Sequence, residues 1–280
     1  MLGHQLLDQF EDRHEMAVTL RRERDAYQSF PRLSDYCGVY PGVDVRHRSQ
    51  LKNVLADFLP EAVINAVGLI KHRDEAHASV PSLEINALFP HLLAQDCASA
   101  GARLIHMSTD CVFSGDRGNY VESDDSDARD LYGRTKFLGE LNLQHCVTLR
   151  TSIIGLELSR KTGLIEWFLA QRGTIKGYTK AIYSGFTTME MGRVIERVLT
   201  KHTELSGLWH VASRPISKYE LLRLLSDKLA RADIAIEPDD TFICDRSLLG
   251  SRFEKATGYR PPDWDDMLEE LSTMIQSRHE

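Results

Sequence analysis

Residues 103–113 read Arg-Leu-Ile-His-Met-Ser-Thr-Asp-Cys-Val-Phe, an apolar run followed at once by a polar segment. The run Arg103 to Met107 predicts a buried strand. The stretches on either side of it, Leu83 to Ala100 and Tyr132 to Leu143, are longer and have the periodicity of helices. A strand between two helices is typical of a right-handed βαβ crossover. This part of the chain therefore predicts a parallel sheet covered by helices.

The same alternation extends through the first two-thirds of the chain. Further strands are expected at residues 16–20, 43–45, 62–67 and 146–150, and a further helix at 49–58. We predict an α/β fold with a doubly wound parallel sheet over residues 1–155. Residues 156–280 are expected to form a smaller region over the carboxyl ends of the strands, where open α/β sheets bind ligands. Part of 180–202 is expected to pack back on the first region.

Two capping boxes mark helix starts in the second region. Thr187 precedes Glu190, and Ser217 precedes Glu220, each by three residues. In such a pair the hydroxyl accepts a hydrogen bond from the amide three residues later. We therefore expect helices to begin directly after residues 187 and 217.

The chain opens with Met1 to Leu7, which already resembles a helix, with Leu6, Leu7 and Phe10 on one face. A sheet of this kind normally begins with a strand and a glycine-rich turn, and neither precedes this helix. One hypothesis is a start codon assigned too late, or a fragment, with about ten residues absent. The other is a protein without its first, central strand. We favour the former, because a sheet lacking that strand exposes two unpaired edges.

The composition is that of an ordinary globular protein, with 42% hydrophobic and 27% charged residues among 280. The net charge of −7 provides no overall positive field for nucleic acid. The longest uncharged stretch near the middle, residues 62–70, is too short for a membrane span, and acidic residues near the start argue against a signal peptide. Five cysteines without paired spacing are expected to be reduced thiols in a cytoplasmic protein that holds no metal.

Three side chains of the predicted sheet edge suit carbonyl reduction. Tyr132 and Lys136 are four residues apart, so they project from one helix face, and Thr109 follows the strand that precedes this helix. A ketone accepting hydride needs a proton donor and a second group that orients its oxygen. We assign the proton to Tyr132, the orientation to Thr109, and the lowering of the tyrosine pKa to Lys136. The alternative is a surface helix pair beside a threonine that caps a strand.

With these motifs in order, the chain resembles the extended short-chain dehydrogenase/reductases, and specifically the dTDP-4-dehydrorhamnose reductases. The resemblance covers nearly the whole chain. Its blocks are Met1-Leu2-Gly3, Asp44-Val45, 63–68 (VINAVG), Asn86-Ala87, 108–113 (STDCVF), 132–140 (YGRTKFLGE), 150–152 (RTS), 207–210 (GLWH) and 262–264 (PDW). It implies a Rossmann-type dinucleotide-binding domain over 1–155 and a substrate-binding region over 156–280.

The chain departs from the family pattern at three places. Cys111 stands where the family has tyrosine, and Gly68 replaces a small side chain. Residues 177–185 do not match the family loop that borders the sugar site. The sugar can therefore differ from dTDP-4-dehydrorhamnose while the chemistry stays the same.

The resemblance implies a nicotinamide dinucleotide cofactor. Its expected contacts are Leu2, Gly3, Arg21, Asp44, Val45, Ala66, Val67, Gly68, Tyr132 and Lys136, the last through the ribose. The pair Arg21-Arg22 after the second expected strand favours NADP(H), because a guanidinium can bind the additional phosphate. The alternatives are NAD(H) and an arginine pair in a solvated turn.

The expected substrate is a nucleotide sugar. Its candidate contacts are Asp110, Trp167, Tyr178 and Tyr183. The two tyrosines lie between glycines and are expected to face a cleft, whereas Trp167 has a helix core as its alternative.

We therefore predict an NADPH-dependent reductase of a nucleotide-activated 4-keto-6-deoxy sugar that serves surface polysaccharide synthesis, with a homodimer as a compatible assembly. One alternative is an epimerase or dehydratase of the same superfamily, in which Asp110 supplies an additional carboxylate. The other is a non-catalytic, nucleotide-binding regulatory subunit, because methionine adenosyltransferase beta subunits share the resemblance.

Overall fold

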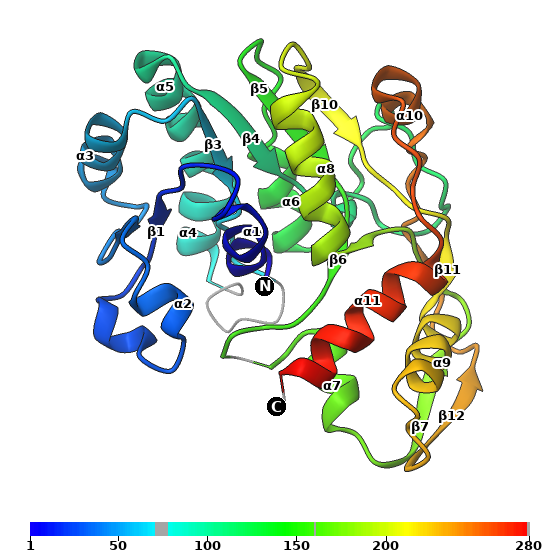
Figure 1. Cartoon of the computed structure of the whole chain (residues 1–280). Coiled ribbons are helices and arrows are strands. Elements are labelled where there is room, and N and C mark those ends of the chain that lie inside the picture. Colours follow the sequence, from blue (N-terminus) through cyan, green and yellow to red (C-terminus); the bar gives the residue numbers. More distant parts are fainter. Residues whose placement is uncertain (71–77, 160, 279–280) are drawn as a thin grey trace.

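The centre of the molecule is a four-stranded parallel sheet with the strand order β10–β5–β4–β3 (Figure 1). The computed structural model describes residues 1–70, 78–159 and 161–278. The strands are β3 (Ala62–Asn65), β4 (Arg103–Met107), β5 (Cys146–Arg150) and β10 (Gly207–His210). All three pairings are parallel, which confirms the predicted α/β class.

The strands that were expected to form one parallel sheet form two separate sheets. β1 (Val18–Thr19) pairs in parallel with β2 (Val39–Tyr40) and forms a separate two-stranded sheet. Among the described strands, β3 is hydrogen-bonded to β4 alone. The division of the chain at residue 155 stays a prediction, and β10, which lies after this boundary, is part of the four-stranded sheet.

Helices cover both faces of the four-stranded sheet because neighbouring strand residues point to opposite sides. Leu104 packs with Leu51 and Leu93 from α3 (Arg48–Phe58) and α5 (Phe89–Ala100). Ile105 packs with Leu6 and Ile195 from α1 (Leu2–Phe10) and α8 (Thr188–Thr200). The short α4 (Ser79–Ser82), the π-helix η3 (Leu83–Leu88) and α6 (Leu131–Leu138) lie near α5 (Figure 1).

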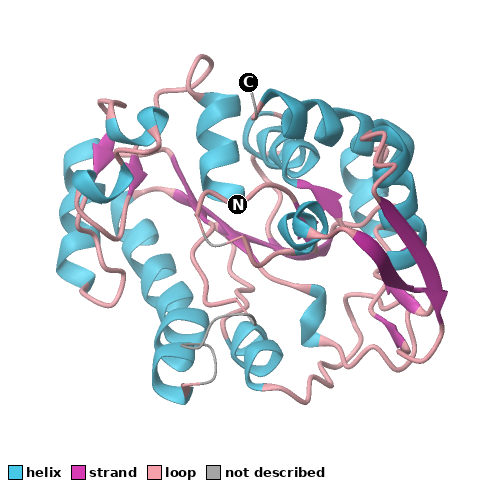
Figure 2. Cartoon of the chain, turned by 90° about the horizontal axis from the view of Figure 1, so that it is seen from below, coloured by secondary structure: helices cyan, strands magenta, loops and turns pink. Residues whose placement is uncertain are grey.

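The rest of the second region lies to one side of the sheet, as Figures 1 and 2 show. Three small sheets lie there: β7 (Gly173–Tyr178) with β12 (Ile234–Asp239), β9 (Phe186–Thr187) with β6 (Ile153–Ile154) of the first region, and β8 (Ala181–Tyr183) with β11 (Ile216–Ser217) and β13 (Cys244–Asp245). Its helices besides α8 are α7 (Leu164–Ala170), α9 (Lys218–Lys228), α10 (Ser251–Thr257) and α11 (Trp264–Ser277). The remaining short helices are η1 (Arg24–Tyr27), α2 (Pro31–Ser34) and η4 (Asp110–Val112).

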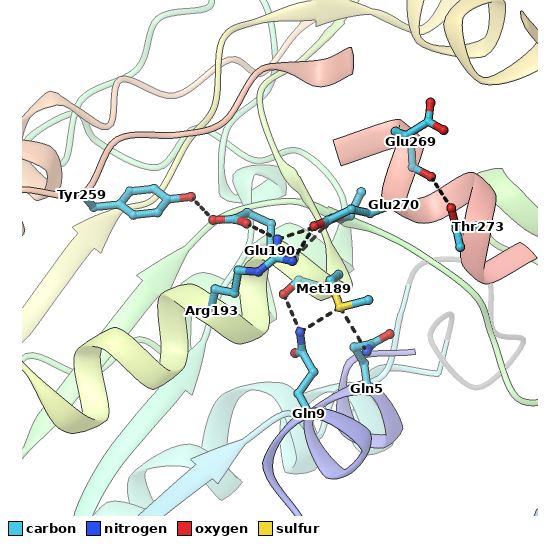
Figure 3. A network of polar contacts seen from close by, with 10 residues as sticks. Gln5, Gln9, Met189, Glu190, Arg193, Tyr259, Glu269, Glu270 and Thr273 are labelled. Atoms are coloured by element: carbon cyan, nitrogen blue, oxygen red, sulfur yellow. Dashed lines mark hydrogen bonds and ion pairs between the residues drawn. The ribbon is translucent and has the colours of Figure 1, made fainter. Parts of the chain in front are cut away.

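A polar network joins α8 to the C-terminal part of the chain (Figure 3). The buried Glu190 carboxylate accepts hydrogen bonds from the Tyr259 hydroxyl at 2.7 Å and from Arg193 at 2.8 Å. Arg193 also donates to Glu270 of α11 at 2.8 Å. The network therefore ties α11 to the helix that covers the sheet.

Several local predictions are confirmed. The Thr187 hydroxyl accepts from the Glu190 amide, the Ser217 hydroxyl accepts from the Glu220 amide, and a helix begins after each. The N-terminal helix is present, with Leu6, Leu7 and Phe10 buried.

Other boundaries were wrong. The strand expected at 43–45 lies earlier, at Val39–Tyr40, because Gly42 adopts a φ of +69° and turns the chain directly after it. The helix expected over 83–100 begins as the π-helix η3 and continues as α5. The helix expected over 132–143 ends at Leu138, and Gly139 follows as its cap.

No helix in the described part of the chain is long and apolar enough to span a bilayer. Over the same residues, no three or more His, Cys, Asp or Glu side chains are grouped so that they could hold a metal ion.

Candidate active site

The carboxyl end of β4 lies against the start of α6, and this contact brings the three predicted catalytic residues together. Thr109 lies close enough to Tyr132 for its hydroxyl to lower the Tyr132 pKa. One turn further along α6, Lys136 Nζ donates to the Met107 carbonyl oxygen at 2.7 Å. The sequence therefore identified residues that are neighbours in the fold, and their catalytic roles stay predictions.

Local chemistry explains why α6 begins here and how closely it approaches β4. The Asp130 carboxylate accepts a hydrogen bond from the Gly133 amide at 2.8 Å and caps the helix. A Cβ on Gly133 would lie 2.1 Å from the Cys111 carbonyl oxygen. Only glycine allows α6 to lie this close to η4, so the second residue of the Tyr-Gly motif sets the position of the first.

The pKa shifts of Tyr132 and Lys136 differ from those that the sequence predicts. Burial raises the pKa of Tyr132, a nearby Cys111 raises it further, and the neighbouring Thr109 hydroxyl opposes both. Burial lowers the pKa of Lys136 to about 8, and Glu140 opposes this shift. The expected lowering of the tyrosine pKa by Lys136 is not among these effects, because the ammonium points at the Met107 carbonyl.

Thr109 and the adjacent Asp110 are held together by a hydrogen bond at the candidate active site. The Thr109 hydroxyl accepts from the Cys111 amide at 3.1 Å and donates to Asp110 Oδ1 at 3.2 Å. Burial raises the pKa of Asp110, and the Arg246 guanidinium opposes that shift. Asp110 is thus a buried carboxyl group beside the candidate catalytic threonine.

The loop after β3 is held beside α6 by one side chain. Asn86 of η3 accepts from the Leu69 amide at 2.8 Å, donates to the Leu69 carbonyl at 3.0 Å, and donates to Thr135 of α6 at 3.4 Å. A π-helical turn of this kind is frequent at functional sites. Asn86 therefore fixes the loop that carries the candidate cofactor residues.

This loop has a surface suited to the flat ring of a nicotinamide. Ala66 and Val67 are exposed at the carboxyl end of β3. A Cβ on Gly68 would meet only Asn86 Oδ1, at 3.4 Å, so the backbone there is open. Likewise, a Cβ on Gly3 in the first turn of α1 would meet nothing within 4 Å, whereas the Leu2 side chain is buried in the core.

The residues expected near the adenosine lie in the segments that follow the two strands of the separate β1–β2 sheet. The Arg46 guanidinium binds both Asp44 carboxylate oxygens, and this pair lowers the Asp44 pKa, with a smaller contribution from Arg21. Arg21 and Asp44 are therefore close in space, and Val45 packs beside Leu51 at the edge of the core. Arg21 and Asp44, the basic and the acidic candidate for cofactor binding, are thus neighbours in the fold.

The three aromatic candidates for the substrate have different surroundings. Tyr183 is 9% exposed, its hydroxyl donates to the Phe186 carbonyl at 3.1 Å, and its ring packs on Trp264. The structure thus places it in the core and not at a cleft, because its hydroxyl has backbone partners. Trp167 on α7 and Tyr178 at the end of β7 are 39% and 38% exposed, so their assignments stay predictions.

Two residues near the site had no signal in the sequence. Arg246 donates to the Phe113 carbonyl at 2.8 Å and lies 3.8 Å from the Cys111 sulfur, across 135 positions of sequence from that cysteine. Phe242, four residues earlier, packs on Tyr178 with ring centroids 5.1 Å apart. The sequence analysis did not identify Arg246 and Phe242, because they are far along the chain from the residues that they contact, and only folding brings these segments together.

The fold and the site define the class of protein. A parallel α/β sheet with a threonine after β4 and a Tyr-x-x-x-Lys pair on the next helix is the arrangement of an oxidoreductase of the short-chain dehydrogenase/reductase type. The chain belongs to the RmlD substrate binding domain family, whose model matches residues 1–276.

Relatives and solved structures agree with this assignment. The dTDP-4-dehydrorhamnose reductase of Aggregatibacter actinomycetemcomitans is 24% identical over 82% of this chain and 86% of its own length. The dTDP-4-dehydrorhamnose reductase of Bacillus anthracis, solved in complex with NADP, has a TM-score of 0.73 and 20% identity over 93% of this chain and all of its own. The Bordetella bronchiseptica enzyme WbmG, solved with NAD and UDP, has a TM-score of 0.79 and 16% identity over 99% of this chain and 92% of its own.

Proposed function

We propose that this protein reduces the keto group of a nucleotide-activated 4-keto-6-deoxy sugar with NADPH, in the synthesis of surface polysaccharide. The observation that carries the proposal is the contact of Thr109 and Tyr132 beside Lys136. The names of its relatives support the substrate class: besides the reductases, a spore coat polysaccharide biosynthesis protein of Bacillus subtilis is 24% identical over 81% of the chain.

The residues present fit this chemistry. A bound nicotinamide supplies the hydride that reduces the keto carbon. The raised pKa of Tyr132 keeps its phenol protonated at neutral pH, so the phenol can donate its proton to the developing alkoxide. Thr109 orients the same oxygen. Lys136, with a pKa of about 8, is mostly charged at neutral pH, and its ammonium is held at the Met107 carbonyl, from where it can bind the ribose of the cofactor.

The preference for NADPH rests on Arg21 and Arg22, which directly follow β1 beside Asp44. A guanidinium at this place can bind the 2′-phosphate of NADP, whereas an acidic residue there would repel it. The ratio of kcat/KM for NADPH to that for NADH measures this preference, and a ratio below one would contradict it.

The first test is the substitution Tyr132→Phe, which removes only the phenolic hydroxyl. Loss of a general acid of this kind lowers kcat by about 10²–10⁴-fold. The measurement is oxidation of NADPH with dTDP-4-keto-6-deoxy sugars, and Tyr259→Phe serves as the matched control, because that hydroxyl binds Glu190 away from α6. A Tyr132→Phe variant as active as the parent would show that another group donates the proton.

One observation favours a second candidate function. Asp110 is a buried carboxyl group with a raised pKa beside Thr109, and an epimerase or dehydratase would use such an additional acid. The two functions differ in how they treat the cofactor, because a dehydratase regenerates it within each turnover. Oxidised cofactor that stays bound through purification would favour the dehydratase, and net consumption of NADPH would favour the reductase.

A further inference from the structure

A charged cluster lies directly beneath the candidate catalytic residues. The Glu140 carboxylate accepts hydrogen bonds from Ser108 Oγ at 2.6 Å and from Arg150 Nε and Nη2, each at 2.7 Å. Ser108 directly follows β4 and immediately precedes Thr109, Arg150 ends β5, and Glu140 follows the cap of α6. The cluster therefore links the two central strands to the helix of the active site.

Glu140 lies just beyond the cap of α6, the helix that carries the candidate catalytic tyrosine and lysine. Tyr132, Lys136 and Glu140 lie beside three consecutive residues at the carboxyl end of β4. Tyr132 lies close to Thr109, Lys136 donates to the Met107 carbonyl, and Glu140 accepts from Ser108. Contact with Ser108 thus completes a row of which the other two members are the candidate catalytic tyrosine and lysine.

The backbone permits this row only through a close approach. A Cβ on Gly139 would lie 2.0 Å from the Asn86 carbonyl oxygen, so the chain must turn against η3 at a glycine. Glu140 is then delivered to the strand ends rather than to solvent, and its side chain is 9% exposed. The end of α6 is therefore fixed from both sides.

Every strong hydrogen-bonding group of the cluster has a partner. Arg150 Nη1 lies 3.2 Å from His210 Nε2, and its guanidinium stacks over the Phe113 ring at 5.2 Å. Since an arginine can only donate, His210 Nε2 accepts, and its Nδ1 donates to the Tyr120 carbonyl at 3.1 Å. Burial, followed by Arg150, lowers the His210 pKa to about 3, so the imidazole is neutral at neutral pH.

Stability alone does not account for such a cluster. Two charges removed from water gain little net stability from each other, and well-packed apolar side chains often serve as well. An ion pair also fixes orientation: the planar guanidinium orients the carboxylate, and the carboxylate orients the serine hydroxyl. Because Ser108 is adjacent to Thr109, a fixed Ser108 restricts the position of the candidate catalytic threonine.

We propose that Ser108, Glu140 and Arg150 form a positioning unit that holds Thr109 in register with Tyr132 and Lys136. The unit touches neither substrate nor cofactor and acts through the end of β4. This inference rests on the proposed reductase function. The position of Thr109 relative to Tyr132 and Lys136 thus depends on one hydrogen bond, from Ser108 Oγ to the Glu140 carboxylate.

The test is Ser108→Ala, which removes this hydrogen bond and leaves the Glu140–Arg150 ion pair intact. Small displacements of catalytic groups cost up to about 10²-fold in rate, so we expect kcat to fall about tenfold or more. The KM for the nucleotide sugar should change less than about twofold. In a Thr109→Val background the same substitution should cost nothing further, because residues that act through one another are not additive. Tyr259→Phe, the control, should keep the parental kcat.

Amide hydrogen exchange provides a readout that needs no turnover. Ser108→Ala should speed exchange in residues 108–113 and 131–138, while Tyr259→Phe should leave these segments unchanged. A parental kcat for Ser108→Ala, a full additional loss in the Thr109→Val background, or unchanged exchange would each overturn the positioning unit. If the parent oxidises no NADPH with any 4-keto-6-deoxy nucleotide sugar, the reductase function fails, and the exchange data alone decide whether the unit holds β4 in place.

Discussion

Glu140 and Glu190 are two buried carboxylates that each accept hydrogen bonds from a hydroxyl and an arginine, in different parts of the molecule. Glu140 lies between the ends of β4 and β5 and binds Ser108 and Arg150. Glu190 lies at the start of α8 and binds Tyr259 and Arg193, as drawn in Figure 3. The chemistry is the same, and the surroundings of the arginine differ.

The two sites differ in how far their arginines are exposed to solvent. The Arg150 side chain is 3% exposed, whereas that of Arg193 is 47% exposed and also binds Glu270. Water therefore solvates the arginine at the Glu190 site but not the arginine at the Glu140 site, although the two carboxylates are buried alike. The comparison teaches that an ion pair fixes geometry most strictly where water cannot enter, and here that place is beneath the candidate catalytic residues.

The largest difference between the sites should follow removal of each arginine. Arg150→Met leaves Glu140 buried with only Ser108 as a partner, and we expect a loss of about 3–5 kcal/mol in the free energy of unfolding. Arg193→Met removes an arginine that water already solvates and leaves Glu190 with Tyr259, so its loss should be about 1 kcal/mol. Urea unfolding followed by circular dichroism measures both, and equal losses would remove the distinction.

A smaller difference should appear in acid. The His210 pKa of about 3 lies below its unfolded value near 6.5, so the unfolded chain binds more protons between these values. Stability is therefore present above pH 6.5 and is lost as the pH falls towards 3, by up to about 1.4 kcal/mol per pH unit for this group. Among the described residues, no histidine is hydrogen-bonded to Glu190, Arg193 or Tyr259.

His210→Gln should flatten this dependence, because glutamine does not titrate. His4, whose pKa burial lowers to about 4, contributes an acid loss of the same sign that the variant retains. The pH dependence of the urea midpoint measures the difference, and identical slopes in parent and His210→Gln would refute the assignment.

The smallest effect should come from Tyr259→Phe. Its hydroxyl is one of two partners of Glu190, so we expect a loss of about 1–2 kcal/mol with the parental kcat. Tyr40→Phe is the surface counterpart, because that hydroxyl binds the exposed Asp57, and its loss should be smaller. A fall in kcat for Tyr259→Phe would mean that the Glu190 site also influences the reaction.

Much of the fold could be predicted because its signals are local. Arg103–Met107 and Cys146–Arg150 are strands at the predicted bounds, and the hydroxyls of Thr187 and Ser217 cap helices as expected. Apolar patterning and capping involve residues a few positions apart, so sequence records them directly. The strand expected at 43–45 was wrong because a single positive-φ glycine moved the turn.

By itself, the sequence determined the class of the sheet and the candidate catalytic motif, because each depends on residues a few positions apart. Only the tertiary structure decided that Tyr183 is a core residue, that Arg246 lies beside Cys111, and that Ser108, Glu140 and Arg150 meet beneath Thr109. These contacts join different strands and helices. Their partners are set by how the layers pack, which no local pattern in the chain encodes.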